Sequence, residues 1–303
     1  MPVDLTSRLR AIEAIFDETA WLLESGAKRD AITHRLFAVE VADLVGEGFI
    51  AQDQQSRELV GACVRRVAGA FLTDAVNRRL DVTTRVRIAL AAGGHYDALA
   101  EAILQEATPQ TVAVMAKDGR LFAQYRGFRD TDFGLPDDLF EILSGQAEWI
   151  ASRLRVAEVA WQSGREGRTL VVTSHSAAEP AGLGQSVPRM TIGQVAGRVT
   201  LQSLPGNEGT LLRATFDLGG LLDRTPDGGA RREVRVQLDL DGTSCDVPLL
   251  ATPIDMPSQF LRHGARPYRL RPFRDSRDRL VIEVAPVTLR KVARRVKRDL
   301  IGR

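Results

Sequence analysis

Two Asp-x-Asp triplets have the residue types and the spacing that could support metal-assisted catalysis. They are Asp130-Thr131-Asp132 and Asp239-Leu240-Asp241, and paired carboxylates of this kind can hold a divalent cation against a diphosphate. A catalytic triplet of that type ends a strand of a nucleotide-binding α/β domain, but no alternation of strands and helices precedes either triplet here. The second triplet runs from an alternating strand into a turn, and the first lies in a predicted loop. We therefore predict that neither binds a metal.

The histidines and cysteines give no local sign of a metal site or an activated nucleophile. Four histidines lie far apart without the spacing of zinc ligands, and they are His34, His95, His175 and His263. In Ser174-His175-Ser176, neighbouring side chains of a strand point to opposite faces, and no carboxylate that could orient the histidine is identifiable. Cys63 and Cys245 stand on apolar faces, as buried thiols do.

The common catalytic motifs are also missing from the sequence. It contains no phosphate-binding Walker loop, no Gly-x-Ser-x-Gly, no His-Glu-x-x-His and no Cys-x-x-Cys. We predict no catalytic residue, no metal and no cofactor in this chain.

Two tryptophans are the candidates for contact with a carbohydrate. Trp149 and Trp161 flank the start of a predicted β domain, and an indole ring offers a sugar an apolar plane with a polar edge. Aromatic residues make up only 6% of the chain, so no extended stacking surface is expected. In the alternative interpretation, one or both rings pack in the β-domain core or at the junction between domains.

A basic segment ends the sequence. The net charge of +2 is too balanced for a general nucleic-acid-binding protein, yet residues 289–303 hold seven basic residues and one aspartate. Apolar residues recur at helical spacing from Leu289 to Leu300, which predicts a basic amphipathic helix over 288–303. The side chains expected to bind an anionic membrane or a polyanion are Arg290, Lys291, Arg294, Arg295, Lys297 and Arg298. Equally open is that this helix packs on the β domain or on other subunits.

Residues 4–106 have the periodicity of amphipathic helices. Apolar residues at three- to four-residue intervals form one stripe from Leu5 to Leu23 and another from Val60 to Phe71. Glycines predict helix ends near residues 26, 46–48 and 93–94. Asp53 and Asp81 are placed to cap the next helices. Five helices in about a hundred residues predict a small helical bundle.

From residue 111 onward, apolar residues recur at every second position. Asp118-Gly119 favours the positive φ angles of a tight hairpin between 111–115 and 121–125, and a short helix through Phe140 and Ile142 is expected after it. Val234, Val236, Leu238 and Leu240 alternate with polar residues, as in a strand with one buried face. Further predicted strands are 156–162, 169–174, 190–202, 210–217, 267–272 and 280–284. About eight short strands favour a β-sandwich.

Chain length indicates two domains, because 303 residues is about twice the usual size of one. We predict an α+β fold, with a helical bundle and a small β-hairpin over 1–148, a β-sandwich over 149–287 and the basic helix over 288–303. No stretch approaches the ~20 apolar residues that span a bilayer, and no signal peptide is recognisable. We expect a cytoplasmic chain that can reach the inner face of the plasma membrane through its basic helix.

Several stretches of the sequence resemble one protein family. They are His34-Arg35-Leu36-Phe37, the run from Arg85 to Leu90, His95 to Leu99, Asp118 to Tyr125, Phe128-Arg129-Asp130, Ala214 to Leu218, Val234 to Leu240, Arg266 to Pro272 and Arg279 to Val284. In their order and content they resemble the non-catalytic C-terminal region of bacterial family 2 glycosyltransferases that modify teichoic acids and other cell-wall glycopolymers. The resemblance implies a helical linker domain followed by an immunoglobulin-like β-sandwich. The nucleotide-sugar domain of that family does not appear in this sequence.

The resemblance also implies a function without bond making. We expect an accessory region that supports homo-oligomerisation, with a trimer as the family-based expectation, and that positions a cell-envelope glycopolymer beside a catalytic glycosyltransferase domain. The first alternative is an independent protein- or carbohydrate-binding module with no link to a transferase. The second is an enzyme whose site is not recognised. We expect no nucleic-acid partner.

Overall fold

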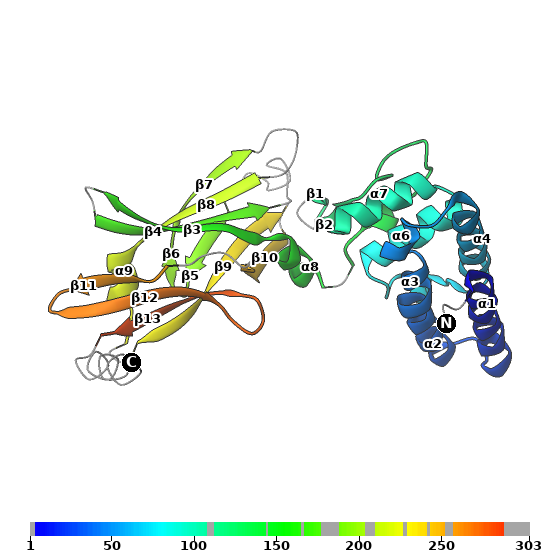
Figure 1. Cartoon of the computed structure of the whole chain (residues 1–303), viewed down its shortest axis with the longest axis horizontal. Coiled ribbons are helices and arrows are strands. Elements are labelled where there is room, and N and C mark those ends of the chain that lie inside the picture. The colour runs from blue at the N-terminus through cyan, green and yellow to red at the C-terminus, as the bar shows by residue number, and fades with distance from the viewer. Residues whose placement is uncertain are drawn as a thin grey trace, which may run out of the picture. The chain divides into compact units, whose positions relative to one another are not determined.

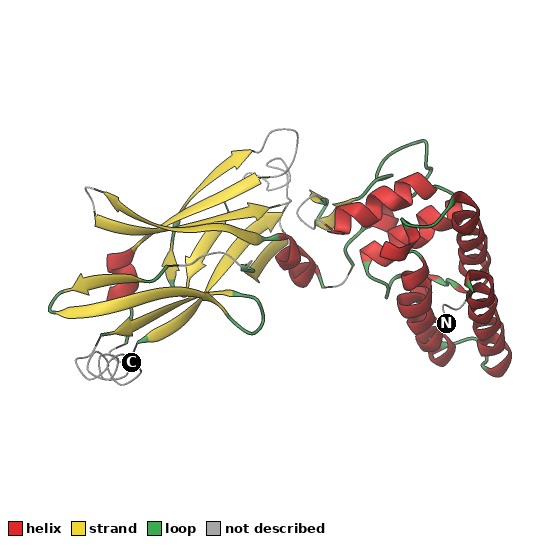
Figure 2. Ribbon diagram, in the orientation of Figure 1, coloured by secondary structure: helices red, strands yellow, loops and turns green. Residues whose placement is uncertain are grey.

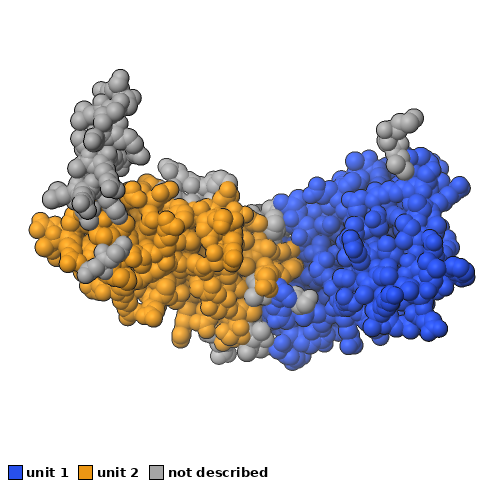
Figure 3. Space-filling model, turned by 90° about the horizontal axis from the view of Figure 1, so that it is seen from below, with its two compact units in different colours: residues 1–146 blue, residues 147–303 orange. Residues whose placement is uncertain are grey.

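The structure is a computed structural model that describes residues 4–107, 112–143, 145–164, 167–176, 188–203, 210–226, 229–240, 243–251 and 257–287. The chain divides into two compact units, residues 1–146 and residues 147–303 (Figure 3). Helices dominate the first unit and antiparallel strands the second (Figure 2). This order of elements confirms the predicted α+β class.

The first unit is a set of packed helices (Figure 1), and the apolar stripes of these helices are buried. The longer ones are α1 (Leu5–Leu22), α2 (Ala27–Leu36), α4 (Gln54–Phe71), α6 (Val82–Gly93) and α7 (Tyr96–Ala107), and the shorter ones are η1 (Phe37–Val41), α3 (Ala42–Leu44), η2 (Glu47–Phe49) and α5 (Asp74–Asn77). Phe16 of α1 packs between Phe37 and Phe71, with ring centroids 4.9 and 5.3 Å away. Aromatic contacts therefore join α1 to η1 and α4.

Two predicted helix starts are fixed by aspartate caps. The carboxylate of Asp53 accepts a hydrogen bond from the backbone N–H of Ser56 at 2.8 Å, and Asp81 accepts one from Thr84 at 2.9 Å. Each bond satisfies an amide that has no partner within its helix. At the end of α6, Gly94 takes a φ of 79°, in the left-handed region that glycine adopts without strain.

The predicted hairpin is present as β1 (Ala113–Lys117) and β2 (Arg120–Gln124). Asp118 and Gly119 take positive φ angles of 52° and 71°, as a two-residue turn between right-twisted strands requires. The structure differs after the hairpin, where the 3₁₀ helix η4 (Asp137–Phe140) ends before Ile142. The chain then becomes extended because Glu141 forms a β-bridge with Phe122.

The second unit contains two antiparallel sheets. After α8 (Gln146–Arg153), a four-stranded sheet runs in the order β3 (Arg155–Gly164), β4 (Gly167–Ser176), β8 (Thr210–Asp217) and β7 (Arg198–Ser203). The larger sheet runs in the order β11 (Gln259–His263), β12 (Arg266–Arg274), β13 (Leu280–Pro286), β9 (Ala230–Leu240), β5 (Arg189–Ile192) and β6 (Val195–Ala196), and β10 (Thr243–Pro248) pairs with β9. The short helix α9 (Leu218–Asp223) follows β8 and lies between the two layers at one end of the unit (Figure 1).

Strand β9 has the predicted alternation. Val234, Val236 and Leu238 are buried, and Arg235 and Gln237 between them face away from the core. Since the side-chain period of a strand is two, this pattern determines which face of the sheet covers the core.

The predicted strand 190–202 is three strands in the structure. Gly193 takes a φ of 59° and turns the chain between β5 and β6, which pair with each other. The chain then changes sheets, because β7 pairs with β8, with Arg198 opposite Thr215. Helices α8 and α9 and strand β11 were not predicted. The predicted basic helix, with its arginines and lysines, falls in 288–303, outside the described residues.

No helix in the described part of the chain is both long enough and apolar enough to cross a bilayer.

Replacing Phe16 tests the division into two units. Phe16→Ala should lower the free energy of unfolding of the helical unit by about 3–5 kcal/mol, because the ring is 1% exposed and its removal leaves a cavity in the core. The adjacent Ile15→Ala, at a position 44% exposed, should cost less than about 1 kcal/mol. Differential scanning calorimetry of the intact chain measures both. An equal shift of every transition with Phe16→Ala would show that the chain unfolds as one unit.

Candidate functional site

Trp149 lies on α8 with one face of its indole ring covered. The guanidinium carbon of Arg153 sits 3.6 Å from the ring centroid, a cation–π contact that occupies the face a sugar would use. The indole Nε1 of Trp149 is buried without a partner among the described residues. These contacts favour packing over sugar stacking for this residue.

Trp161 lies on β3 and is half-buried. Its indole Nε1 donates a hydrogen bond to the backbone oxygen of Pro257 at 2.8 Å. On the paired strand β4, Nη1 of Arg168 donates to the backbone oxygen of Phe260 at 3.0 Å. The two bonds join the β3–β4 hairpin to β11 and to Pro257 just before it, so the Trp161 ring is held in place through its N–H.

The two tryptophans do not form a shared surface. Helix α8 lies at the start of β3 (Figure 1), and Trp161 stands six residues after Arg155, the first residue of β3. At about 3.3 Å per residue, Trp161 is roughly 20 Å along the strand. Trp161 remains a candidate for carbohydrate contact.

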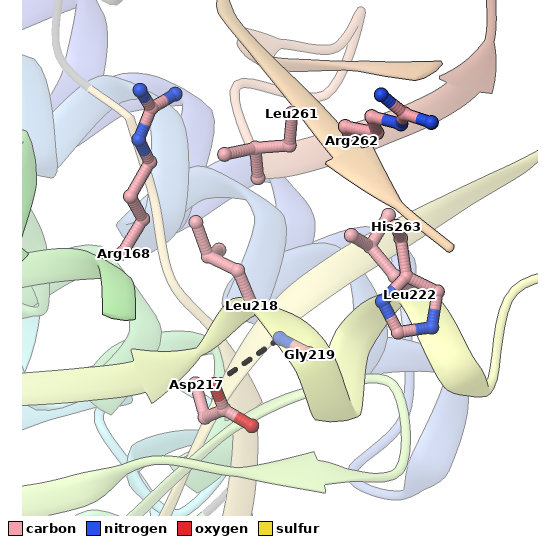
Figure 4. Close-up of a pocket in the computed structure, with 8 residues that line it drawn as sticks. All are labelled: Arg168, Asp217, Leu218, Gly219, Leu222, Leu261, Arg262 and His263. Atoms are coloured by element: carbon pink, nitrogen blue, oxygen red, sulfur yellow. Dashed lines mark hydrogen bonds between the residues drawn. The ribbon is translucent and has the colours of Figure 1, made fainter. Parts of the chain in front are cut away.

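The β unit has a cavity of about 480 Å³, and Arg168 is one of the residues that line it. It is bounded by β4, the end of β8, α9 and the edge strand β11. The lining residues are Arg168, Asp217, Leu218, Gly219, Leu222, Leu261, Arg262 and His263. Figure 4 shows Leu218 and Leu261 between Arg168 on one side and Arg262 and His263 on the other. The cavity therefore has an apolar centre and basic sides.

Hydrogen bonds to backbone groups organise the cavity walls. The carboxylate of Asp217 accepts from the amides of Gly219 at 3.1 Å and Gly220 at 2.9 Å, which caps α9. Nε of Arg262 donates to the backbone oxygen of Gly264 at 3.2 Å. Nε2 of His263 lies 2.7 Å from Oδ1 of Asp223, so α9 and β11 are joined at this side of the cavity.

Arg168 and Arg262 make the cavity suited to anions. Within the described part of the chain, neither guanidinium contacts a carboxylate, and each donates to a backbone oxygen instead. The acidic residue of the lining, Asp217, has its oxygens taken by backbone amides. Two such guanidiniums can bind phosphate or carboxylate oxygens, while Leu218 and Leu261 can contact an uncharged part of the same ligand.

Other residues considered from sequence do not assemble into a reactive centre. The carboxylate of Asp130 accepts from the backbone N–H of Asp132 at 3.1 Å, as in an Asx turn. Among the described residues, no group of three or more histidines, cysteines, aspartates or glutamates could hold a metal ion. His34 and His263 lie in different units, with Nε2 of His34 3.2 Å from the backbone oxygen of Arg79.

Sequence reasoning missed most of the cavity. Arg168, Asp217 and Arg262 are far apart along the chain. The pairing of β4 with β8 brings the first two together, and Arg262 comes from β11 of the other sheet. One local signal was available, because Asp217 precedes Leu218-Gly219-Gly220-Leu221-Leu222, a cap residue before an apolar run that predicts a helix start.

Comparison with known proteins confirms the predicted resemblance to the non-catalytic C-terminal region of bacterial glycosyltransferases. Residues 2–103 match the family model for the glycosyl transferase TarS linker domain. The helical unit is thus the part of the chain that carries the family match.

Two solved structures of TarS from S. aureus match most of this chain. The crystal structure of its residues 217–571 matches with a TM-score of 0.61 and 14% sequence identity, over 93% of this chain and 77% of that one. The crystal structure of S. aureus TarS matches with a TM-score of 0.48 and 13% identity, over 95% of this chain and 50% of that one. At such identities the first likeness shows a shared fold. No curated protein matches the chain.

The two cysteines should be unreactive in the folded protein. Burial raises the pKa of the Cys63 thiol to about 11, and the Glu13 carboxylate adds to the rise. Burial also raises the pKa of Cys245. At pH 8 roughly one Cys63 in a thousand is therefore a thiolate, and an aromatic disulfide reagent should label the native chain slowly and the denatured chain at both positions. Rapid labelling of native chain at pH 8 would contradict this burial.

Proposed function

We propose that this chain is the non-catalytic accessory region of a glycosyltransferase that acts on a cell-envelope glycopolymer, and that it positions the acceptor. The observation that carries the proposal is the linker-domain match over residues 2–103 in a chain whose two units share the fold of S. aureus TarS 217–571. The enzyme named in that comparison is a glycosyl transferase, and teichoic acid is the acceptor class that the sequence resemblance implies.

The β-unit cavity supports this role chemically. A glycopolymer of the teichoic acid type alternates phosphate groups with polyol or sugar units. A protein that binds it therefore meets negative charges separated by uncharged units. Arg168 and Arg262 can bind phosphate oxygens, and the leucines between them can contact the carbon chain. Two aromatic residues lie near Arg168. Phe260 accepts the Arg168 hydrogen bond through its backbone and has a side chain that is 55% exposed, and Trp161 donates to Pro257, three residues before Phe260.

Two further elements of the proposal concern assembly and location. We propose that the chain associates with further copies of itself, as the resemblance implies. The basic segment 288–303 would add contact with an anionic leaflet or with the polymer.

Charge removal at the cavity tests acceptor binding. Arg168→Gln combined with Arg262→Gln should weaken binding of a purified wall teichoic acid about tenfold or more, because each charge-assisted hydrogen bond contributes about 1.5–3 kcal/mol. Added salt should weaken binding to the unmodified chain as it screens the same charges. Fluorescence anisotropy with end-labelled polymer measures both effects.

Arg189→Gln provides the matched control. Arg189 is an exposed arginine on β5, four strands away from β11 in the same sheet, so its loss removes charge without touching the cavity. Equal weakening by the control would show nonspecific attraction. Unchanged binding by the double variant would remove the cavity from the proposal. Polymer binding by the chain without any effect of the chain on a transferase would favour the independent binding module.

A further inference from the structure

Helices α1 and α2 lie side by side as an antiparallel hairpin (Figure 1). The guanidinium of Arg8 on α1 pairs at 2.5 Å with Asp43 of α3, which continues α2 and η1. Further along α1, the ring of Phe16 packs on that of Phe37. As the residue numbers rise along α1, those of the facing segment therefore fall, and these two contacts set the register between them.

The outer face of α1 is apolar. Trp21 is 83% exposed, Leu22 is 60% exposed, and Ile15 is exposed as well. The stripe of α1 that faces the core is a different one, made of Leu9, Ile12 and Phe16. Ile15 and Leu22 follow Arg8 at intervals of seven residues, about two turns, so they lie toward α2. A surface helix usually carries polar residues opposite its buried stripe, and apolar residues gathered there indicate an interaction surface.

Helix α2 adds exposed apolar residues on the side of α1. The guanidinium carbon of Arg29 lies 5.9 Å from the centroid of the Phe71 ring, which stacks on Phe16 of α1. Ile32 follows Arg29 by three residues and is exposed on the same side of α2. Val39 of η1 is also exposed. Both helices of the hairpin therefore contribute apolar surface.

Charged residues on the outer faces of the two helices are complementary. Glu18 on α1 and Arg35 on α2 are exposed, and neither contacts an opposite charge within the described part of the chain. The same holds for Arg10, while Asp43 keeps 69% of its side chain exposed although it pairs with Arg8. The hairpin register places Glu18 level with Arg35, and Arg10 level with Asp43. Acidic positions of one helix are thus level with basic positions of the other.

We propose that the outer face of the α1–α2 hairpin binds the same face of a second copy of this chain. The two-fold axis runs parallel to the helices, so that α1 of each copy lies over α2 of the other. A two-fold interface uses one surface twice, and that surface must be complementary to itself. In this arrangement Glu18 meets the partner's Arg35 and Arg10 meets the partner's Asp43, and each pair forms twice.

Trp21 is the anchor of this interface. The register places Trp21 level with Ile32, so its ring lies over the partner's Ala31 and the partner's Ile32. Ala31 is exposed and small, which leaves room for the indole. Tryptophan is enriched among the residues that contribute most to binding. We expect a contact between two hairpins to be smaller than the roughly 800 Å² per partner of a standard interface, and to form in the micromolar range.

The proposal rests on the association between copies proposed above, and it names the surface that makes the contact. Sedimentation velocity of the full chain across micromolar concentrations tests it. Trp21→Ala should weaken self-association about thirtyfold, the loss expected at a hot spot. Leu22→Ala should weaken it as well, whereas Leu104→Ala, at a similarly exposed leucine of α7, should leave it unchanged. All three variants should melt like the unmodified chain, because the replaced side chains are exposed.

Exchanged charges give a second test of the same surface. Glu18→Arg alone places two arginines opposite each other at both contacts, and Arg35→Glu alone places two glutamates there, so neither variant should associate through the hairpin. An equal mixture of the two variants restores opposite charges at both contacts and should form a mixed dimer. A purely structural role for either residue would give no recovery on mixing.

Three results would overturn the proposal: Trp21→Ala associates like the unmodified chain, Leu22→Ala and Leu104→Ala act alike, or the mixed charge variants stay apart. An unmodified chain that is monomeric throughout would remove the proposal together with the association between copies. Polymer binding by the same variants should be unchanged, since the β-unit cavity is untouched. Failure of the hairpin interface is therefore distinguishable from failure of acceptor positioning.

Discussion

The β unit depends on the register of strand β9. Its eleven residues pair with β13 near the start and with β5 and β10 further along. Val234 and Val236 are buried on one face, while on the other Arg235 is 3.0 Å from Asp246 of β10. A shift of one residue would exchange these faces. Because β11 reaches β9 only through β12 and β13, the same register places the edge strand that bounds the basic cavity.

The cavity also depends on two side chains that cross from one sheet to the other. Trp161 and Arg168 each donate a hydrogen bond to a backbone oxygen, that of Pro257 just before β11 and that of Phe260 within it. Such bonds fix the position of a guanidinium without neutralising it. Arg168 therefore keeps its charge at the cavity, where we propose that the polymer binds. In the helical unit, Arg85 is used in a similar way, since its two Nη groups hold the backbone oxygens of Asp138 and Glu141.

The sequence predicted those parts of the fold that depend on interactions between residues close together in the chain. The caps at Asp53 and Asp81, the Asp118-Gly119 turn and the alternation of β9 all follow from contacts within a few residues. The prediction of one strand over 190–202 was wrong, because the turn at Gly193 and the change of sheet depend on tertiary pairing. For the same reason the cavity could not be predicted, since Arg168, Asp217 and Arg262 meet only in the folded chain. Trp161 was identified for its ring face, and the structure adds a role for its N–H.

The central claim is that this chain positions an acceptor and makes no glycosidic bond. The most direct measurement incubates the purified chain with nucleotide sugars and a divalent cation, with and without polymer, and follows release of the nucleotide. We predict no release above the uncatalysed rate under either condition, because no group of three or more histidines, cysteines, aspartates or glutamates among the described residues could hold a metal ion. Release that depends on the amount of chain and is lost with mutation of its residues would contradict the account.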